Sequence, residues 1–202
     1  MEIQGKVALV TGAAKRLGRA MALELGRRGA RVAVHYGRSK DEAEAVAREI
    51  EAMGGRAEAF GADLKNLSRI DDLCDRVESA FGPVDILMNS ASVFHRTTFG
   101  HVSHEDWDDT LGSNLRGPFF LSQRIGPGMK RRGAGKVINF GDANTPYAVP
   151  DFLPYAIAKA GVEALTLVLA RALAPEVQVN AILPGAILPA SGGDEAGWEA
   201  AV

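Results

Sequence analysis

The stretch Lys6–Arg28 constrains the fold most strongly, because it reads as a strand, a tight loop and a helix with no spacer between them. Its first part, Lys6–Thr11, contains the continuous apolar run Val-Ala-Leu-Val, which is typical of a parallel strand covered on both faces. Gly12 and Gly18 then border a loop that turns sharply. The first turn of the following helix directs its N–H groups and its positive dipole end at this loop. The stretch predicts a phosphate-binding loop, with an unliganded glycine turn as the alternative.

Further apolar runs alternate with longer segments of helical character. The expected strands are Ala30–Tyr36, Ala57–Phe60, Val84–Asn89, Lys136–Phe140 and Val177–Leu183. One expected helix ends at Met53, and others span Asn66 to Ala80 and Phe152–Leu173. A long helix is expected over Ser103–Met129, interrupted only by Gly112, Gly117 and Pro118. This alternation predicts an α/β fold: a single-domain Rossmann-type doubly wound parallel sheet, with helices on both faces and the strand order 3-2-1-4-5-6.

The composition supports one domain over residues 1–202, because 47% of the chain is hydrophobic. The formal net charge of −2 gives no electrostatic reason to expect nucleic acid. The basic cluster Lys130–Arg132 lies where a helix ends, and cations there offset the helix dipole. The single cysteine, Cys74, cannot form an internal disulfide, and no apolar run has the ~20 residues of a membrane span. We therefore expect a cytoplasmic protein that has neither a membrane nor a nucleic-acid partner.

A doubly wound sheet binds its ligand beyond the carboxyl ends of the strands, at the point where the strand order reverses. We therefore expect the chemistry to lie in the loops that follow strands one, two, four and five. These loops are Gly12–Gly18, Arg38–Ser39, Asn89–Phe94 and Gly141–Thr145.

The end of the second strand indicates which nucleotide is bound. An NAD-binding unit usually has an acidic residue there, which accepts hydrogen bonds from the ribose, and this chain has none. A guanidinium beside a hydroxyl instead suits a 2′-phosphate, so the pattern favours NADPH over NADH. The alternative is that Arg38 is a solvated turn residue. The residues concerned are His35, Tyr36, Arg38 and Ser39, together with Lys15 and Arg16 of the glycine loop.

Tyr155 and Lys159 are four residues apart, which places a phenol and an ammonium on the same face of a helix. An unperturbed tyrosine, with a pKa of about 10, is too weak an acid for work at neutral pH, and a fixed cation nearby favours its ionised form. Lys159 is expected to supply that cation. The alternative is an ordinary amphipathic helix with a snorkelling lysine.

With these motifs the sequence resembles the short-chain dehydrogenase/reductase family, and the resemblance extends from Val7 to Gly185. The matching residues, in order, are Thr11–Gly12 through Leu17 and Gly18, Asp63–Leu64, Asn89–Ser90–Ala91, Asn114, Tyr155 with Lys159, and Pro184–Gly185.

The resemblance implies roles for the matching residues around a bound NADPH. Tyr155 and Lys159 would be catalytic, and Lys159 would also hold the nicotinamide ribose hydroxyls. Asn114 would belong to a proton relay behind Lys159, and long helices such as the one that contains it suggest a homotetramer. The remaining residues would contact the cofactor: Asp63 and Leu64 at the adenine, Asn89, Ser90 and Ala91 along its channel, and Gly12, Leu17, Gly18, Pro184 and Gly185 elsewhere.

Three positions depart from the family pattern. Arg16 replaces the central glycine of the loop, Ser92 the glycine after Asn-x-Ala, and Asp142 the serine about thirteen residues before the tyrosine. Loss of activity is one interpretation of these changes. The changes also resemble one subgroup, the pteridine and dihydromonapterin reductases. Four patterns carry that likeness: Thr11–Gly18, His35–Ser39, Asn89–Phe94, and Asp142 with Tyr155 and Lys159.

Asp142 also argues for this subgroup on physical grounds. A carboxylate that faces a ketone oxygen would repel the developing alkoxide, whereas pterin ring nitrogens and amino groups suit a carboxylate acceptor or proton source. Phe94 could stack on a flat heterocycle, and Arg16 could reach both a phosphate and the polar edge of the ring. The expected substrate contacts are thus Arg16, Ser92, Phe94, Asp142 and Tyr155. The alternatives are that Phe94 is a core residue and that Asp142 caps a turn.

The sequence therefore predicts a reductase in which NADPH delivers hydride to a C=N bond of a dihydropterin, dihydromonapterin or dihydrofolate, a small-molecule substrate. Tyr155, assisted by Lys159 and Asp142, would supply the proton. Two alternatives remain: a 3-oxoacyl-thioester or general carbonyl reductase, and a non-catalytic NADP-binding sensor or scaffold.

Two further signals concern metals and the C-terminus. Five residues resemble a metal cluster by composition: His101, His104, Asp106, Asp108 and Asp109. Ser103 with Asp106 instead indicates a helix N-cap, so no metal is expected. By resemblance, the family continues after Gly185 through a substrate-covering segment to a seventh strand. We therefore expect the domain to be incomplete after about residue 190, with Leu188 at a position where a threonine commonly contacts the nicotinamide.

Overall fold

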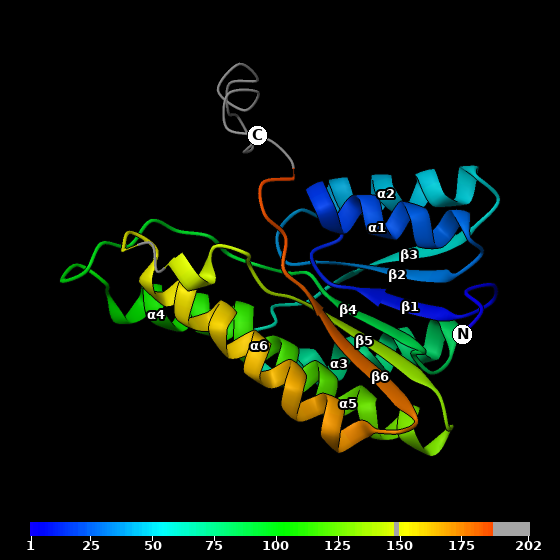
Figure 1. The fold of residues 1–202 in the computed structure, drawn as a ribbon. Helices are drawn as coiled ribbons and strands as arrows, with labels where there is room; N and C mark the ends of the chain where they lie inside the picture. Colours follow the sequence, from blue (N-terminus) through cyan, green and yellow to red (C-terminus); the bar gives the residue numbers. More distant parts are fainter. Residues whose placement is uncertain (148–149, 188–202) are drawn as a thin grey trace.

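The fold is a parallel sheet between two layers of helices, seen in a computed structural model that describes residues 1–147 and 150–187 (Figure 1). The sheet has six strands in the order β3-β2-β1-β4-β5-β6, all paired in parallel, which confirms the predicted topology. The strands are β1 Val7–Val10, β2 Arg31–Tyr36, β3 Arg56–Gly61, β4 Ile86–Asn89, β5 Gly135–Phe140 and β6 Val177–Ile182. The expectations for Leu188 and the residues after it lie outside the described residues.

The helices lie on both faces of the sheet. α1 (Arg16–Arg27) and α2 (Lys40–Ala52) cover one face over β1 to β3 (Figure 1). The opposite face carries α3 (Leu67–Phe81), α5 (Gly117–Arg131) and α6 (Leu153–Leu173). A central strand between two such layers must be apolar on both sides, which explains the first apolar run.

Alternate residues of β1 enter two separate cores. Val7 and Leu9 pack with the residues of α3 and α5, whereas Ala8 and Val10 pack with those of α1 and α2. All four side chains are fully buried. Cys74 lies in the first of these cores as a buried free thiol, as the sequence predicts.

The expected long helix over Ser103–Met129 is continuous along the chain but divided at Gly112 and Gly117, two of the positions where the sequence predicts interruptions. It comprises α4 (His104–Leu111), a π-helical turn at Gly112–Arg116, and α5. The Ser103 hydroxyl accepts from the Asp106 N–H at 3.0 Å, and the Asp106 carboxylate accepts from the Ser103 N–H at 3.0 Å, so the predicted N-cap is confirmed. A π turn inserts an extra residue into the helical period, and five residues are too few for that to show in the pattern of apolar residues.

The part of the chain that the structure describes contains neither a membrane-spanning helix nor a cluster of metal ligands. Within residues 1–147 and 150–187, none of the helices has the length and hydropathy needed to cross a membrane. No group of three or more His, Cys, Asp or Glu side chains in the same ranges is arranged to hold a metal ion.

Candidate active site

Two glycines shape the loop after β1 because other chain segments pass too close for a side chain. Gly12 has a φ of +64°, and a Cβ there would lie 2.8 Å from the Ala91 Cα. A Cβ on Gly18 would collide with the Gly12 carbonyl oxygen. The crossing of Ala91 is held by its N–H, which donates to the Thr11 hydroxyl at 2.9 Å. The loop therefore brings bare backbone to the carboxyl edge of the sheet, as the sequence predicts.

Arg16 occupies the left-handed region, with a φ of +52°. That conformation costs a non-glycine residue roughly 1–2 kcal/mol, which explains why this loop position normally carries glycine. The Arg16 side chain is exposed at the start of α1. Its neighbour Lys15 forms an ion pair with Glu42 at 2.7 Å, so Lys15 ties the loop to α2.

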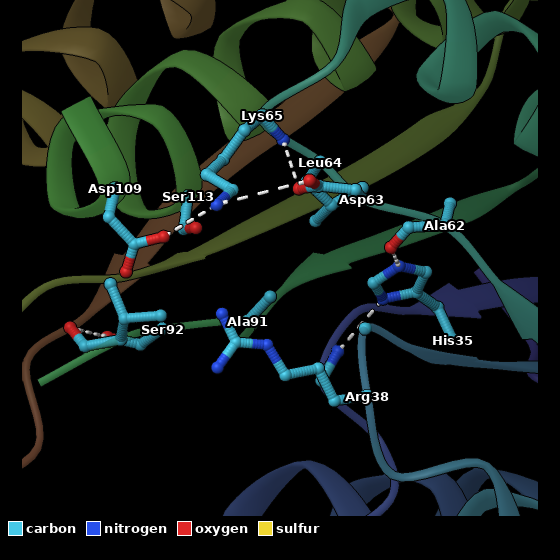
Figure 2. Close-up of a pocket in the computed structure, with 13 residues that line it drawn as sticks. His35, Arg38, Ala62, Asp63, Leu64, Lys65, Ala91, Ser92, Asp109 and Ser113 are labelled. Carbon is cyan, nitrogen blue, oxygen red and sulfur yellow. Dashed lines mark hydrogen bonds and ion pairs between the residues drawn. The ribbon is translucent and has the colours of Figure 1, made fainter. Parts of the chain in front are cut away.

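A cavity of about 330 Å³ opens beside this loop, between the ends of β1, β2 and β4 and the π turn (Figure 2). Of its lining residues, the sequence predicted Gly12, His35, Arg38, Asp63, Leu64, Ala91 and Ser92 as site residues, and it missed Gly37, Ala62, Lys65, Val93, Asp109 and Ser113. The predicted cofactor loops after β1, β2 and β4 thus converge on one cavity.

A charged pair that the sequence did not predict spans one wall of this cavity (Figure 2). Lys65 Nζ lies 2.7 Å from Asp109 Oδ1, and Asp109 Oδ2 lies 3.2 Å from His95 Nε2. The hydrogen bond to Lys65 lowers the pKa of Asp109. The pair lies between the end of β3 and α4, which are remote in sequence, so no local pattern could reveal it.

Other residues of the predicted cofactor set do not line the cavity. The Tyr36 ring lies against Gly61, where it fills the space that a side chain would need. The Pro184 carbonyl accepts from the Ala143 N–H at 3.1 Å and so joins the ends of β5 and β6. Leu17 is partly buried against the core beneath α1 and α2, and Ser39 immediately precedes α2. Ser90, after β4, is half-buried, and Gly185 is exposed.

Asn89 belongs to a buried polar chain and not to the cavity wall. Its Nδ2 donates to Asn139 Oδ1 at 2.8 Å, and Asn139 Nδ2 donates to the Thr166 hydroxyl at 2.9 Å. The three side chains are at most 6% exposed and connect β4, β5 and α6. Among the described residues, Asn89 Oδ1 is buried without a hydrogen-bond donor.

The three predicted catalytic side chains at β5 and α6 lie together. Tyr155 donates its phenolic hydrogen to Asp142 Oδ2 at 2.7 Å. Lys159 Nζ lies 5.5 Å from the centre of the Tyr155 ring and donates to the Phe140 carbonyl at 2.6 Å. The helix places the phenol and the ammonium on one face, and the end of β5 supplies the carboxylate.

The expected lowering of the Tyr155 pKa by Lys159 is not found in this arrangement, where the pKa is raised by other groups. Burial, followed by the hydrogen bond to Asp142 and its charge, raises the pKa of Tyr155. Burial also lowers the pKa of Lys159 to about 8, against the opposing effect of the Asp142 charge. The ammonium is bonded to a backbone carbonyl instead of the phenol, and burial, together with the Asp142 carboxylate, determines the pKa of Tyr155. Tyr155 is therefore a protonated group, ready to donate, at neutral pH.

A second cavity, of about 190 Å³, lies directly beside Tyr155. Phe94 stacks on Phe152, with ring centres 4.3 Å apart and planes 9° apart, and meets the Tyr155 ring edge-on at 4.7 Å. Phe94 is 59% exposed, so the alternative that it is a core residue is wrong. Phe152, which the sequence did not single out, forms part of the same aromatic wall. Asp142, Asn144, Thr145 and Ala156 complete the lining.

Asp142 both caps a turn and contacts Tyr155, through different oxygen atoms. Its Oδ1 accepts from the Asn144 N–H at 2.7 Å and caps a turn, while its Oδ2 accepts from Tyr155. The turn fixes the carboxylate in the orientation that the hydrogen bond to the phenol requires.

Asn114, at the π turn, holds the loop after β4. Its amide Oδ1 accepts from the Val93 N–H and its Nδ2 donates to the Val93 carbonyl, both at 2.8 Å. The side chain thus supports the segment that leads to Phe94. Its role in a proton relay stays a prediction.

Residues 6–199 match the family described as short chain dehydrogenase. The chain belongs to this family. The short-chain dehydrogenase described here is 39% identical to the 3-oxoacyl-(acyl-carrier-protein) reductase FabG of Staphylococcus epidermidis, over 91% of this chain and 75% of that protein.

Two solved structures resemble this short-chain dehydrogenase and contain NADP. FolM alternative dihydrofolate reductase 1 from Brucella canis, complexed with NADP, is 32% identical with a TM-score of 0.92, over 99% of this chain and 79% of that one. The angucycline C-6 ketoreductase LanV with bound NADP is 35% identical with a TM-score of 0.84, over 91% of this chain and 73% of that one. These structures agree with the cofactor and the oxidoreductase class that the sequence predicts.

Proposed function

We propose that this short-chain dehydrogenase is an NADPH-dependent reductase of a pterin-type C=N bond, with a dihydropterin, dihydromonapterin or dihydrofolate as substrate. The hydrogen bond between Tyr155 and Asp142, at 2.7 Å beside the aromatic wall, carries the proposal. NADPH supplies the hydride when it is bound. Tyr155 Oη holds the proton that the adjacent ring nitrogen receives, and its raised pKa keeps that proton in place until then.

The carboxylate of Asp142 favours a nitrogen heterocycle over a ketone. A developing alkoxide next to a carboxylate oxygen would be destabilised, whereas ring N–H and amino groups donate to such an oxygen. The exposed Phe94 ring offers an apolar surface for a planar substrate at the mouth of the same cavity. The Brucella canis relative is described as an alternative dihydrofolate reductase, which supports the same substrate class.

Arg38 is proposed to bind the 2′-phosphate of the cofactor. It lines the nucleotide cavity at the end of β2, where no carboxylate stands, and its side chain extends into the cavity (Figure 2). A guanidinium can pair with a phosphate through two hydrogen bonds, so this position suits a dianion. Lys65, on the facing wall, is paired with Asp109 at 2.7 Å, so Arg38 is the cation that we assign to the phosphate.

A substrate panel tests the proposed function. Dihydromonapterin, dihydrobiopterin and dihydrofolate are offered with NADPH, alongside acetoacetyl thioesters, and oxidation of NADPH is followed by absorbance. We expect turnover with at least one pterin at a kcat/KM well above that of the thioesters. Turnover confined to the thioesters would establish the carbonyl-reductase alternative that the FabG relatives suggest. Tight NADPH binding without turnover of any compound would favour a sensor or scaffold.

We also propose that the chain self-associates through the outer faces of α5 and α6. Phe119, Leu167 and Val168 are 40%, 70% and 65% exposed there, beside a shallow apolar groove lined by both helices. A second copy of the same face would bury this surface in a symmetric dimer, and a homotetramer would contain two such dimers. A reducing, cytoplasmic setting fits the free thiol of Cys74.

Light scattering after size-exclusion chromatography tests the self-association. We expect the wild type to elute as an oligomer and Leu167→Glu with Val168→Glu to elute as a smaller species, because two charges would be buried in the interface. The change Glu58→Gln on the exposed surface of β3 is the matched control. A monomeric wild type would contradict the proposal.

A further inference from the structure

His35 lies behind the nucleotide cavity and is only 2% exposed. Its Nδ1 lies 3.2 Å from the Gly12 backbone nitrogen, and its Nε2 lies 3.1 Å from the Ala62 carbonyl oxygen (Figure 2). The Gly12 N–H can only donate, so Nδ1 must be the unprotonated nitrogen and Nε2–H must donate to Ala62. One neutral tautomer therefore satisfies both neighbours.

The backbone of His35 reinforces the same contact. Its carbonyl accepts from the Ala13 N–H at 2.9 Å, so one residue of β2 receives two consecutive N–H groups of the glycine loop. Gly12 has a positive φ, so these two bonds hold the loop at the residue where its backbone turns. Ala62, the other partner, precedes Asp63 on the opposite side of the cavity.

We propose that His35 is a positioning residue for the cofactor, which fixes the glycine loop and joins it to the end of β3 across the back of the cavity. His35 was expected from the sequence to contact the cofactor itself, but both of its ring nitrogens are already bonded to the protein. The inference rests on the cofactor part of the proposed function and is independent of the substrate.

Burial supports this role, because it keeps the ring neutral. The pKa of His35 is lowered to about 4, mainly by its removal from water. A protonated ring would place an Nδ1–H against the Gly12 N–H, so the bond to the loop exists only in the neutral form.

Three variants separate the two bonds. His35→Asn keeps an acceptor near the position of Nδ1 and loses the reach to Ala62. His35→Gln keeps the reach to Ala62 and loses the short acceptor, and His35→Leu removes both. The dissociation constants for NADPH and NADH are measured by the quenching of protein fluorescence, so that no substrate turnover is needed.

We expect His35→Leu to weaken NADPH and NADH alike by about tenfold, because the loop serves the part that both cofactors share. The dissociation constants should rise in the order wild type, Asn, Gln, which is rescue by the variant that keeps the Gly12 bond. Arg38→Leu is the comparison, since it should weaken NADPH alone. If His35→Leu does not fold, the other two variants decide the matter. Equal affinities for all folded variants, or an equal loss in Asn and Gln, would overturn the proposal.

Discussion

Exchange of Asp142 for asparagine is expected to lower kcat/KM for a dihydropterin by about 100-fold or more, within the range for loss of a group that assists proton transfer. Asparagine keeps a side-chain oxygen for the Asn144 N–H, so the turn that Asp142 caps should survive. The amide cannot serve as the carboxylate that accepts from Tyr155. Steady-state rates at several pH values, with the dissociation constant of NADPH measured in parallel, check the prediction.

Serine at the same position provides the matched comparison. Asp142→Ser introduces the hydroxyl that the resemblance to the family predicts here, and it should raise activity on a carbonyl substrate while pterin turnover falls. The affinity for NADPH should remain within about twofold in both variants, because Asp142 lines the second cavity and not the nucleotide cavity. Pterin turnover within about threefold of the wild type would contradict the role of Asp142 and leave a general reductase.

Turnover is expected to decline as the pH rises through about 8, the pKa that burial gives Lys159. When Tyr155 releases its proton, the phenolate forms beside the Asp142 carboxylate, and only the ammonium offsets that charge. Above the pKa of Lys159 the ammonium is lost, so the rate must fall on the alkaline side. The pH dependence of kcat between 6 and 10 gives the midpoint.

The position of this alkaline limb can be shifted by mutation. The negative charge of Asp142 raises the pKa of Lys159, so Asp142→Asn should move the limb to lower pH. Lys159→Met should remove the limb and lower kcat by about 100-fold, since the charge is then absent at every pH. A wild-type rate that stays constant up to pH 10 would assign the proton chemistry to other groups.

The topology and the grouping of the three proposed catalytic residues were predictable because local signals carry them. The apolar run of β1 reflects burial on both faces, and the strand order follows from the alternation of strands and helices. Tyr155 and Lys159 share a face because the helical period requires it. Asp142 was found because it departs from a residue that the family pattern leads one to expect.

The remaining features depend on contacts between distant segments. The pairing of Lys65 with Asp109 joins β3 to α4, and Phe152 meets Phe94 across more than fifty residues of sequence. The raised pKa of Tyr155 follows from burial, which a motif does not encode. His35 matched a cofactor motif, yet its nitrogens are bonded within the protein. Spacing can identify a residue type, but only tertiary structure shows which partner it has.

The polar chain from Asn89 through Asn139 to Thr166 restrains sliding of α6 along its own axis. Thr166 lies seven residues after Lys159, or about 10 Å farther along the helix. A shift by even a fraction of a turn would break a bond that water cannot replace in the interior. The axial position of α6, and with it the position of the phenol and the ammonium at the strand ends, is thereby restrained from the middle of the helix. Substitutions at Thr166 should therefore misalign the Tyr155 hydroxyl and the Lys159 ammonium, although Lys159 lies two helical turns away.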